Sequence, residues 1–192
     1  MKHLSDDELM VRCVCGDRRA MDVLVSRYHS KLLDFAYRHL GDRETSADIA
    51  QTTLLRVFES AGSYQLKASF KTWLYTIALN AIRDEFRRRR VRKESPSAEL
   101  DEAQPQATHD QGNAGKSPED IALGRIAASA AWEAVDRLPE NQKSAIILKF
   151  RHGLSYEEIS AVMGAPSGTV KSWVHFALKT LRDFLEPAEC EV

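Results

Sequence analysis

The 192-residue sequence predicts an all-α protein of two small helical domains joined by a flexible linker, the C-terminal domain containing a helix-turn-helix. Apolar residues recur at helical spacing in both halves, and no stretch shows a convincing period of two. Residues 94–117 change to Ser, Pro, Ala, Gln, Asp and Gly, with Leu100 as the only large aliphatic residue. Such a segment buries too little apolar surface to offset its ordering entropy. We therefore expect domains at 1–93 and 118–187.

Composition and charge are typical of an ordinary soluble protein, with 43% hydrophobic and 29% charged residues. No run of about 18 apolar residues occurs, and the opening MKHLSDDELM lacks the apolar stretch of a signal peptide. We expect a cytoplasmic protein with no membrane partner. Residues 1–93 carry 18 Lys and Arg against 12 Asp and Glu, whereas residues 118–192 carry 8 against 11. The basic charge therefore lies in the first domain.

The three cysteines, Cys13, Cys15 and Cys190, are an odd number and favour reduced thiols over a disulfide framework. Cys13 and Cys15 are either half of a metal site or small helix residues. Because no second Cys or His pair stands at ligand spacing, we expect no metal and no cofactor.

Four helices are expected in the first domain. The spacing predicts them at Asp6 to Val14, Arg19 to Leu40, Arg43 to Ser60 and Phe70 to Lys93, with a loop at Ser63 to Ser69. Gly16, Gly41 and Gly62 stand where helices end. The apolar residues that keep helical spacing, and so face the core, are Met21, Leu24, Val25, Tyr28, Leu32, Phe35, Ala36, Leu40, Ile49, Leu54, Val57, Phe58, Leu74, Ile77, Ala78 and Ala81.

The second domain begins with Ser117-Pro118-Glu119-Asp120, a cap, a first-turn proline and acidic residues that favour a helix start. A helix to Arg137 is expected, then Leu138-Pro139, then a helix through Ile146, Ile147 and Phe150 that ends near Gly153.

Leu154 to Leu185 reads as two helices joined by a tight turn. Ser155 and Glu158 form a capping box, and Gly164 followed by Pro166 ends the first helix. Ser167 caps a second helix whose core-facing residues are Val170, Val174, Ala177, Leu178, Leu181 and Leu185. The opposite side carries Thr169, Ser172, His175, Phe176 and Lys179, flanked by Lys171 and Arg182. This is the geometry of a recognition helix in the DNA major groove; the alternative is a helical hairpin that merely packs.

Several short motifs in a fixed order resemble one family, the extracytoplasmic-function (ECF) group of bacterial RNA polymerase sigma factors. They are Gly16-Asp17, Leu40-Gly41-Asp42, Asp48-Ile49-Ala50-Gln51, the segment Ser69-Phe70-Lys71-Thr72-Trp73-Leu74-Tyr75-Thr76-Ile77-Ala78-Leu79-Asn80, Asp84 with the Arg run, Leu138-Pro139-Glu140, Gly153-Leu154-Ser155-Tyr156-Glu157-Glu158-Ile159 and Gly168-Thr169-Val170-Lys171-Ser172. The resemblance covers nearly the whole chain.

The resemblance implies that the first domain docks on core RNA polymerase, at the β′ clamp helices and β, and opens the promoter −10 element. The residues expected to contact −10 DNA are Tyr64, Lys67, Thr76, Asn80, Arg83 and Arg87. The last four lie along one line of a helix, as phosphate tracking requires, and Tyr64 offers a stacking face. Two alternatives stay open: Tyr64 as a loop anchor, and Arg87 to Lys93 as a solvated charge run. Phe70 and Trp73 are expected in the core.

The second domain is expected to read the −35 element of promoter DNA. The residues implied are Ser167, Thr169, Lys171, Ser172, Trp173, His175, Phe176 and Lys179. Trp173 and Phe176 stand where related proteins commonly have Arg. Loss of guanidinium groups removes guanine readout and leaves apolar contact with thymine methyls, so an unusual −35 preference is expected.

The helix expected to dock on β′ carries Asp48, Gln51, Thr52 and Arg56. Ala47 and Thr52 stand where the family typically has Glu, so two negative charges are missing. Either the protein is a weaker sigma factor, or phosphorylation of Thr52, or of its neighbours Thr53, Thr45 or Ser46, supplies the charge. Control by a Ser/Thr kinase or by an anti-sigma factor stays open.

Two other classes of protein are alternatives to a sigma factor. A stand-alone helix-turn-helix regulator would use the same hairpin but would leave the segment from Asn80 to Lys93 unexplained. An enzyme is not expected, because the sequence shows no Ser/His/Asp set, no phosphate-binding Gly loop and no metal-ligand spacing.

Overall fold

The computed structural model describes residues 3–64, 68–94 and 131–185, and every regular element in these ranges is helical. In chain order they are α1 (Asp6–Val14), α2 (Arg18–Leu40), α3 (Arg43–Glu59), the short 3-10 helix η1 (Ala61–Ser63), α4 (Phe70–Glu94), α6 (Glu140–Ile146), the π-helical turn η2 (Ile147–Arg151), α7 (Tyr156–Met163) and α8 (Ser167–Leu185). Residues 131–136 are also helical. The all-α prediction is confirmed. The expected linker, apart from Glu94, and residues 118–130 lie outside the described residues.

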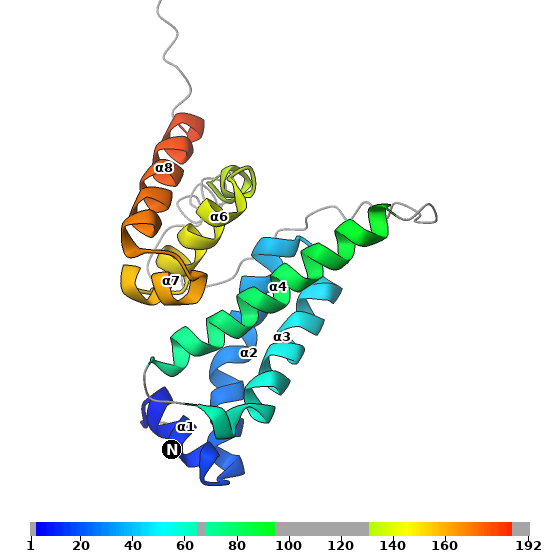
Figure 1. Ribbon diagram of the computed structural model, residues 1–192, viewed down its shortest axis with the longest axis vertical. Helices are drawn as coiled ribbons and strands as arrows, with labels where there is room; N and C mark the ends of the chain where they lie inside the picture. The colour runs from blue at the N-terminus through cyan, green and yellow to red at the C-terminus, as the bar shows by residue number, and fades with distance from the viewer. Residues whose placement is uncertain (1–2, 65–67, 95–130, 186–192) are drawn as a thin grey trace, which may run out of the picture.

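Helix α2 is the central element of the first domain and packs against α1, α3 and α4 (Figure 1). Its buried positions recur every three or four residues, so one continuous stripe faces the other helices. The stripe consists of Ala20, Leu24, Tyr28, Leu32, Phe35, Ala36, His39 and Leu40. Met21 and Val25, predicted to face the core, are only half-buried at its margin.

Short polar side chains and one glycine define the helix ends in the first domain. Ser5 and Glu8 form a capping box on α1, and Asp17 and Asp42 accept backbone N–H groups at the starts of α2 and α3. Gly41 ends α2 at φ 70°, a conformation that costs glycine little. Asp42 therefore starts α3 immediately after α2 ends, and the two helices form an antiparallel pair.

Helix α3 turns a different face to the core from the one predicted. Its buried stripe consists of Ser46, Ile49, Ala50, Thr53 and Val57. Leu54 is half-buried and Phe58 is 58% exposed, so the prediction that Phe58 faces the core is wrong. The two hydroxyl residues can be buried because each donates to a backbone carbonyl one turn earlier, Ser46 to Asp42 and Thr53 to Ile49.

The helix-turn-helix has the predicted form. The Ser155–Glu158 capping box starts α7, and Gly164 ends it in the left-handed region at φ 67°. Ser167 is the first residue of α8 rather than its cap, because the Pro166 carbonyl accepts the Val170 N–H at 3.1 Å. Leu178, predicted to face the core, is 45% exposed, since it lies beyond the edge of the stripe formed by Val170, Val174 and Ala177.

The two domains pack directly against each other, which the sequence pattern did not predict. Helix α7 lies against α4 (Figure 1), and buried residues of both domains form one continuous core cluster. Within the described residues, no helix is both long enough and apolar enough to span a bilayer.

Phe35 is fully buried at the centre of this core, and its ring makes edge-on contacts with Tyr75, His39 and His152. We expect Phe35→Ala to lower the free energy of unfolding by about 3–5 kcal/mol, because it removes a ring from a packed site. Phe150→Ala, at a position 61% exposed, should change it by less than about 0.5 kcal/mol. Urea unfolding checks both variants, and equal losses would contradict this account of the core.

Candidate functional site

Helix α8 presents a solvent-exposed face opposite its buried stripe. Lys171, Ser172, His175, Phe176 and Lys179 are exposed, whereas Ser167, Thr169 and Trp173 are half-buried. The rings of His175 and Phe176 lie 5.7 Å apart on this face. The face thus combines two ammonium groups, an imidazole and an apolar ring, which suits contact with both phosphates and base edges.

Three of the expected −35 residues have part of their side chain engaged within the protein. Ser172 donates its hydroxyl to the Gly168 carbonyl at 3.0 Å, and Lys171 lies over the Tyr156 ring at 5.7 Å from its centroid. Trp173 packs against the core. Phe176, which is 55% exposed, is therefore the aromatic residue on α8 with the most surface available to a base.

Helix α4 carries the line of residues expected to contact −10 DNA. Asn80 and Arg87 are exposed, and Thr76 and Arg83 are half-buried. Thr76 donates its hydroxyl to the Thr72 carbonyl at 2.9 Å, and Arg87 pairs with Asp84 at 3.2 Å. Lys67 lies outside the described residues. The exposed amide of Asn80 and the exposed guanidinium of Arg87 are the groups on this line best placed to meet a nucleic acid.

Tyr64 is held by the first domain in this structure. Its hydroxyl donates to Asp7 at 2.6 Å, and its ring lies 5.1 Å from that of Trp73. Asp7 also accepts the Phe70 N–H at 2.6 Å, so one carboxylate joins α1, the 61–64 turn and the start of α4. Partial burial, followed by the Asp7 carboxylate, raises the pKa of Tyr64. Stacking a base on the ring requires either its outer face or the loss of these contacts.

The arginine run at the end of α4 is divided between two roles. Arg87, Arg88, Arg90 and Arg92 are exposed. Arg89 is half-buried and turns toward α3, where it donates to Thr45 at 3.1 Å and to the Leu40 carbonyl at 3.5 Å and approaches Asp42 at 3.8 Å. Arg89 therefore connects α4 to the start of α3, a role that the run of arginines in the sequence does not indicate.

The outward face of α3 holds the residues expected to dock on polymerase. Asp48 and Gln51 are exposed, and Arg56 is half-buried with its guanidinium 3.9 Å from Asp84. Leu55 and Phe58, at 54% and 58% exposure, continue the same line at helical spacing from Asp48 and Gln51. Neither residue was predicted on this face, although their spacing from Asp48 can be read in the sequence.

The four hydroxyl residues of α3 differ in accessibility. Thr53 and Ser46 are completely buried, and Thr45 accepts a hydrogen bond from Arg89. Thr52 is half-buried, and its hydroxyl forms no side-chain hydrogen bond within the described part of the chain. Thr52 is therefore the one of the four that is neither fully buried nor hydrogen-bonded through its side chain within the described residues.

Cys13 is half-buried and Cys15 is exposed at the end of α1. Burial raises the pKa of the Cys13 thiol, with a smaller contribution from Asp17. In residues 3–64, 68–94 and 131–185 no three His, Cys, Asp or Glu side chains gather into a group able to hold a metal ion.

Comparison with known proteins places both domains in one family. Residues 24–92 match the model of Sigma-70 region 2, and residues 129–181 match that of Sigma-70, region 4. The RNA polymerase sigma-H factor of Pseudomonas aeruginosa is 31% identical over 186 residues, which cover 95% of this chain and 94% of that protein. The ECF RNA polymerase sigma-E factor of Haemophilus influenzae is 31% identical over 188 residues, covering 97% and 98%.

Solved structures share the fold. The structure of CnrH in complex with the cytosolic domain of CnrY aligns with a TM-score of 0.65 at 22% identity, over 94% of this chain and 96% of that one. The sigma factor RpoE in complex with the anti-sigma factor NepR from Bartonella quintana aligns with a TM-score of 0.66 at 24% identity, over 85% and 95%.

The sequence relatives match this chain over nearly its full length, and the family models match both helical domains rather than the helix-turn-helix alone. The resemblance noted in the sequence is thereby confirmed. The chain belongs to the ECF group of RNA polymerase sigma factors, a family of transcription initiation factors.

Proposed function

We propose that this chain binds core RNA polymerase through the outward face of α3 and directs promoter-specific initiation, with α4 contacting the −10 element and α8 the −35 element. We also keep the domain division at 1–93, 94–117 and 118–187 as part of this proposal.

The observation that carries the proposal is the exposure of two large apolar side chains, Leu55 and Phe58, in line with Asp48 and Gln51 on α3. A stand-alone DNA-binding regulator needs no such surface on a helix remote from its recognition helix. An apolar pair beside a carboxylate and an amide is instead typical of a protein interface, where apolar residues supply affinity and charges supply orientation. The β′ clamp helices are the partner that the family membership favours.

Binding to reconstituted core polymerase tests the proposal directly. We expect wild-type protein to co-elute with core enzyme and to support run-off transcription, and Phe58→Ser to weaken binding at least tenfold, since exposed aromatic anchors contribute most to such interfaces. Val91→Ser, at an equally apolar position 68% exposed on α4, is the control and should leave polymerase binding unchanged.

If wild-type protein binds a DNA duplex tightly but never joins core enzyme, the chain is a stand-alone regulator and the proposal fails. Circular dichroism of Phe58→Ser should match that of wild type, because the side chain is exposed and its loss leaves the core intact.

Regulation by phosphorylation of Thr52 is a finer part of this proposal. A phosphate on Thr52 would add a charge of about −1.5 to −2 one helical turn from Asp48. Thr52 itself stands where the family typically has Glu. The accessibility of Thr52 and the burial of Thr53 support Thr52 as the acceptor. Control by an anti-sigma protein is the other proposal, supported by the similar solved structure of RpoE in complex with the anti-sigma factor NepR.

Thr52→Glu should bind core polymerase up to about fivefold more tightly than wild type at low salt, because each added rim pair contributes about 0.2–1 kcal/mol. The difference should shrink at high salt, since exposed charges are screened. Thr53→Val replaces a buried hydroxyl with a methyl group and should leave binding unchanged. Mass spectrometry of active cells should find phosphate on Thr52, and a Thr52→Ala protein that transcribes normally under every condition would end the proposal.

The proposed preference for particular bases in the −35 element depends on the exposed Phe176 side chain of α8. Selection of −35 sequences from a random pool should enrich thymine opposite this side chain, because its ring can contact the thymine methyl but cannot donate to guanine. Phe176→Arg should instead enrich guanine at that position, with a discrimination of about 1–3 kcal/mol. Identical sequences selected by the two proteins would show that Phe176 does not face the bases.

A further inference from the structure

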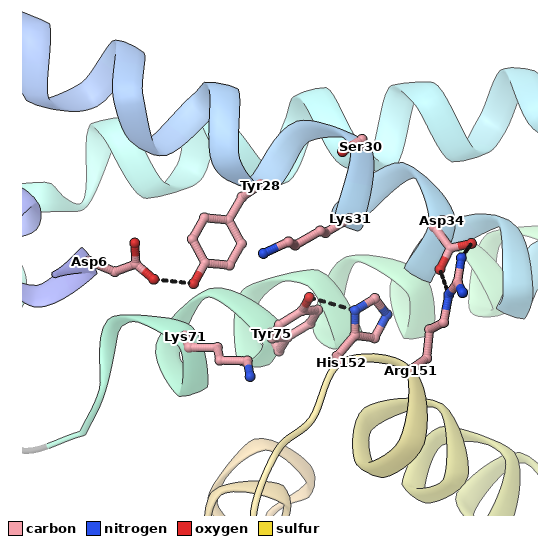
Figure 2. A pocket seen from close by; sticks show the side chains of 9 residues that line it. All are labelled: Asp6, Tyr28, Ser30, Lys31, Asp34, Lys71, Tyr75, Arg151 and His152. Atoms are coloured by element: carbon pink, nitrogen blue, oxygen red, sulfur yellow. Dashed lines mark hydrogen bonds and ion pairs between the residues drawn. The ribbon is translucent and has the colours of Figure 1, made fainter. Parts of the chain in front are cut away.

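A polar cavity lies where α1, α2 and α4 meet the end of η2 (Figure 2). Its volume is about 380 Å³, which lies within the range of small-molecule sites in proteins and far exceeds the space that one water molecule occupies. The proposed polymerase and promoter contacts use none of the residues that line it. Those surfaces therefore leave the cavity without a role.

Two lysines of the lining have no carboxylate partner. Lys31 of α2 lies over the Tyr28 ring, with Nζ 5.0 Å from the ring centroid, and is exposed. Lys71 of α4 is half-buried, and its ammonium donates to the Gly153 carbonyl at 3.4 Å. Figure 2 shows both side chains at the cavity, one from each helix. Neither ammonium forms an ion pair with any residue that the structure describes.

The two carboxylates of the lining are already paired with arginines. Asp34 accepts Nε of Arg151 at 2.9 Å and a terminal nitrogen at 3.2 Å, and both side chains are about three-quarters buried. Asp6 pairs with Arg27 at 2.6 Å and also accepts the Tyr28 hydroxyl. The positive charge of the two lysines is therefore left uncompensated in the cavity.

The electrostatic environment of the cavity favours a bound anion. Burial lowers the pKa of the Lys71 ammonium, and the neighbouring Lys31 lowers it further against an opposing effect of Glu158. Burial also lowers the pKa of His152 to about 4, so its imidazole is neutral at pH 7 and adds no charge. Two ammonium groups that face the same space repel each other, and an anion placed between them relieves that repulsion.

We propose that this cavity is a binding site for a small phosphate-bearing molecule, whose phosphate group is held between the ammonium groups of Lys31 and Lys71. A phosphate monoester carries about −1.5 to −2 charges at pH 7 and offers three acceptor oxygens. It therefore matches two ammonium groups, whereas a single carboxylate would neutralise only one of them. The hydroxyl of Ser30, an exposed residue of the same lining, is a further donor.

The size and lining of the cavity indicate what the rest of the ligand is like. A phosphate group fills only part of about 380 Å³, so the ligand extends beyond it. The hydroxyls of Tyr28 and Tyr75 already donate, to Asp6 and to Nδ1 of His152, and their oxygens can still accept. Hydroxyl groups on the ligand suit such acceptors, as in a sugar phosphate. The inference is independent of the proposed function, because it concerns the free chain.

Isothermal titration calorimetry of the full chain tests the site with two probes, ribose 5-phosphate and inorganic pyrophosphate, in a phosphate-free buffer of low salt at pH 7.5. We expect one site with a Kd below about 1 mM for at least one probe. Tighter binding of ribose 5-phosphate would assign the remaining volume to a sugar, and tighter binding of pyrophosphate would assign it to a second phosphate. Ribose alone should not bind. No heat from either probe at 10 mM would overturn the proposal.

Lys31→Gln and Lys71→Gln should each raise the Kd of the tighter probe at least tenfold, because each removes a charge-assisted hydrogen bond. Lys31→Arg should keep the Kd within about threefold, since a guanidinium also pairs with phosphate. The control is Lys149→Gln, which removes a lysine that likewise lies over a tyrosine ring, 4.4 Å from the Tyr156 centroid, but does not line the cavity. This variant should bind as wild type does.

Equal losses in all three glutamine variants would show unspecific attraction to positive charge and would overturn the site. Because Lys31 is exposed, Lys31→Gln should keep the unfolding midpoint of wild type in urea, so its binding defect is separable from a folding defect. Bound probe should also raise the Tm of wild type and not that of Lys31→Gln, since a ligand stabilises only the fold that binds it. A Tm raised equally in both proteins would contradict the assignment to this cavity.

Discussion

Burial of the Phe35 ring is the constraint on which the rest of the arrangement depends. The ring contacts Tyr75 of α4, His39 of its own helix and His152 of the C-terminal domain. Three segments far apart in sequence thus share one packed aromatic site. Two polar contacts around it cross the boundary, His39 with Ser144 and Tyr75 with Nδ1 of His152, whereas Nε2 of His152 is buried without a hydrogen-bond partner in the described part of the chain. Loss of either contact would leave a buried polar group without its partner and would cost free energy, so these contacts favour one orientation of the two domains.

Helix α3 shows how core composition can create a functional surface. Its core stripe uses Ser46, Ala50 and Thr53, whose small or self-satisfied side chains allow close approach to α2. The larger apolar residues Leu55 and Phe58 are thereby left on the outer face. Because these two side chains are not packed in the core, they contribute little to the stability of the fold. They instead supply the apolar surface on which the proposed polymerase contact depends.

The N-terminal domain also divides its polar groups between structure and proposed function. Asp7 joins the Tyr64 hydroxyl to the start of α4, and Arg89 joins the end of α4 to the start of α3. These contacts hold α4 at both ends. Asn80 and Arg87 lie between these two anchored positions, Phe70 and Arg89, and their side chains are exposed. A helix held this way presents a rigid line of polar groups, which is what recognition of a nucleic-acid backbone requires.

Sequence alone determined the local features of this protein. Capping residues, glycines at helix ends and the 3.6-residue period predicted α1, α2, α4, α7 and α8 to within about one residue, and motifs in a fixed order indicated the family. The tertiary structure alone decided which α3 residues face the core, because Ser46 and Thr53 satisfy their hydroxyls within the helix and polarity then no longer marks the outer face. It alone decided that Arg89 differs from Arg87, and that Asp34 meets Arg151. These pairings join residues up to 117 positions apart, and no local period carries information about contacts over such a separation.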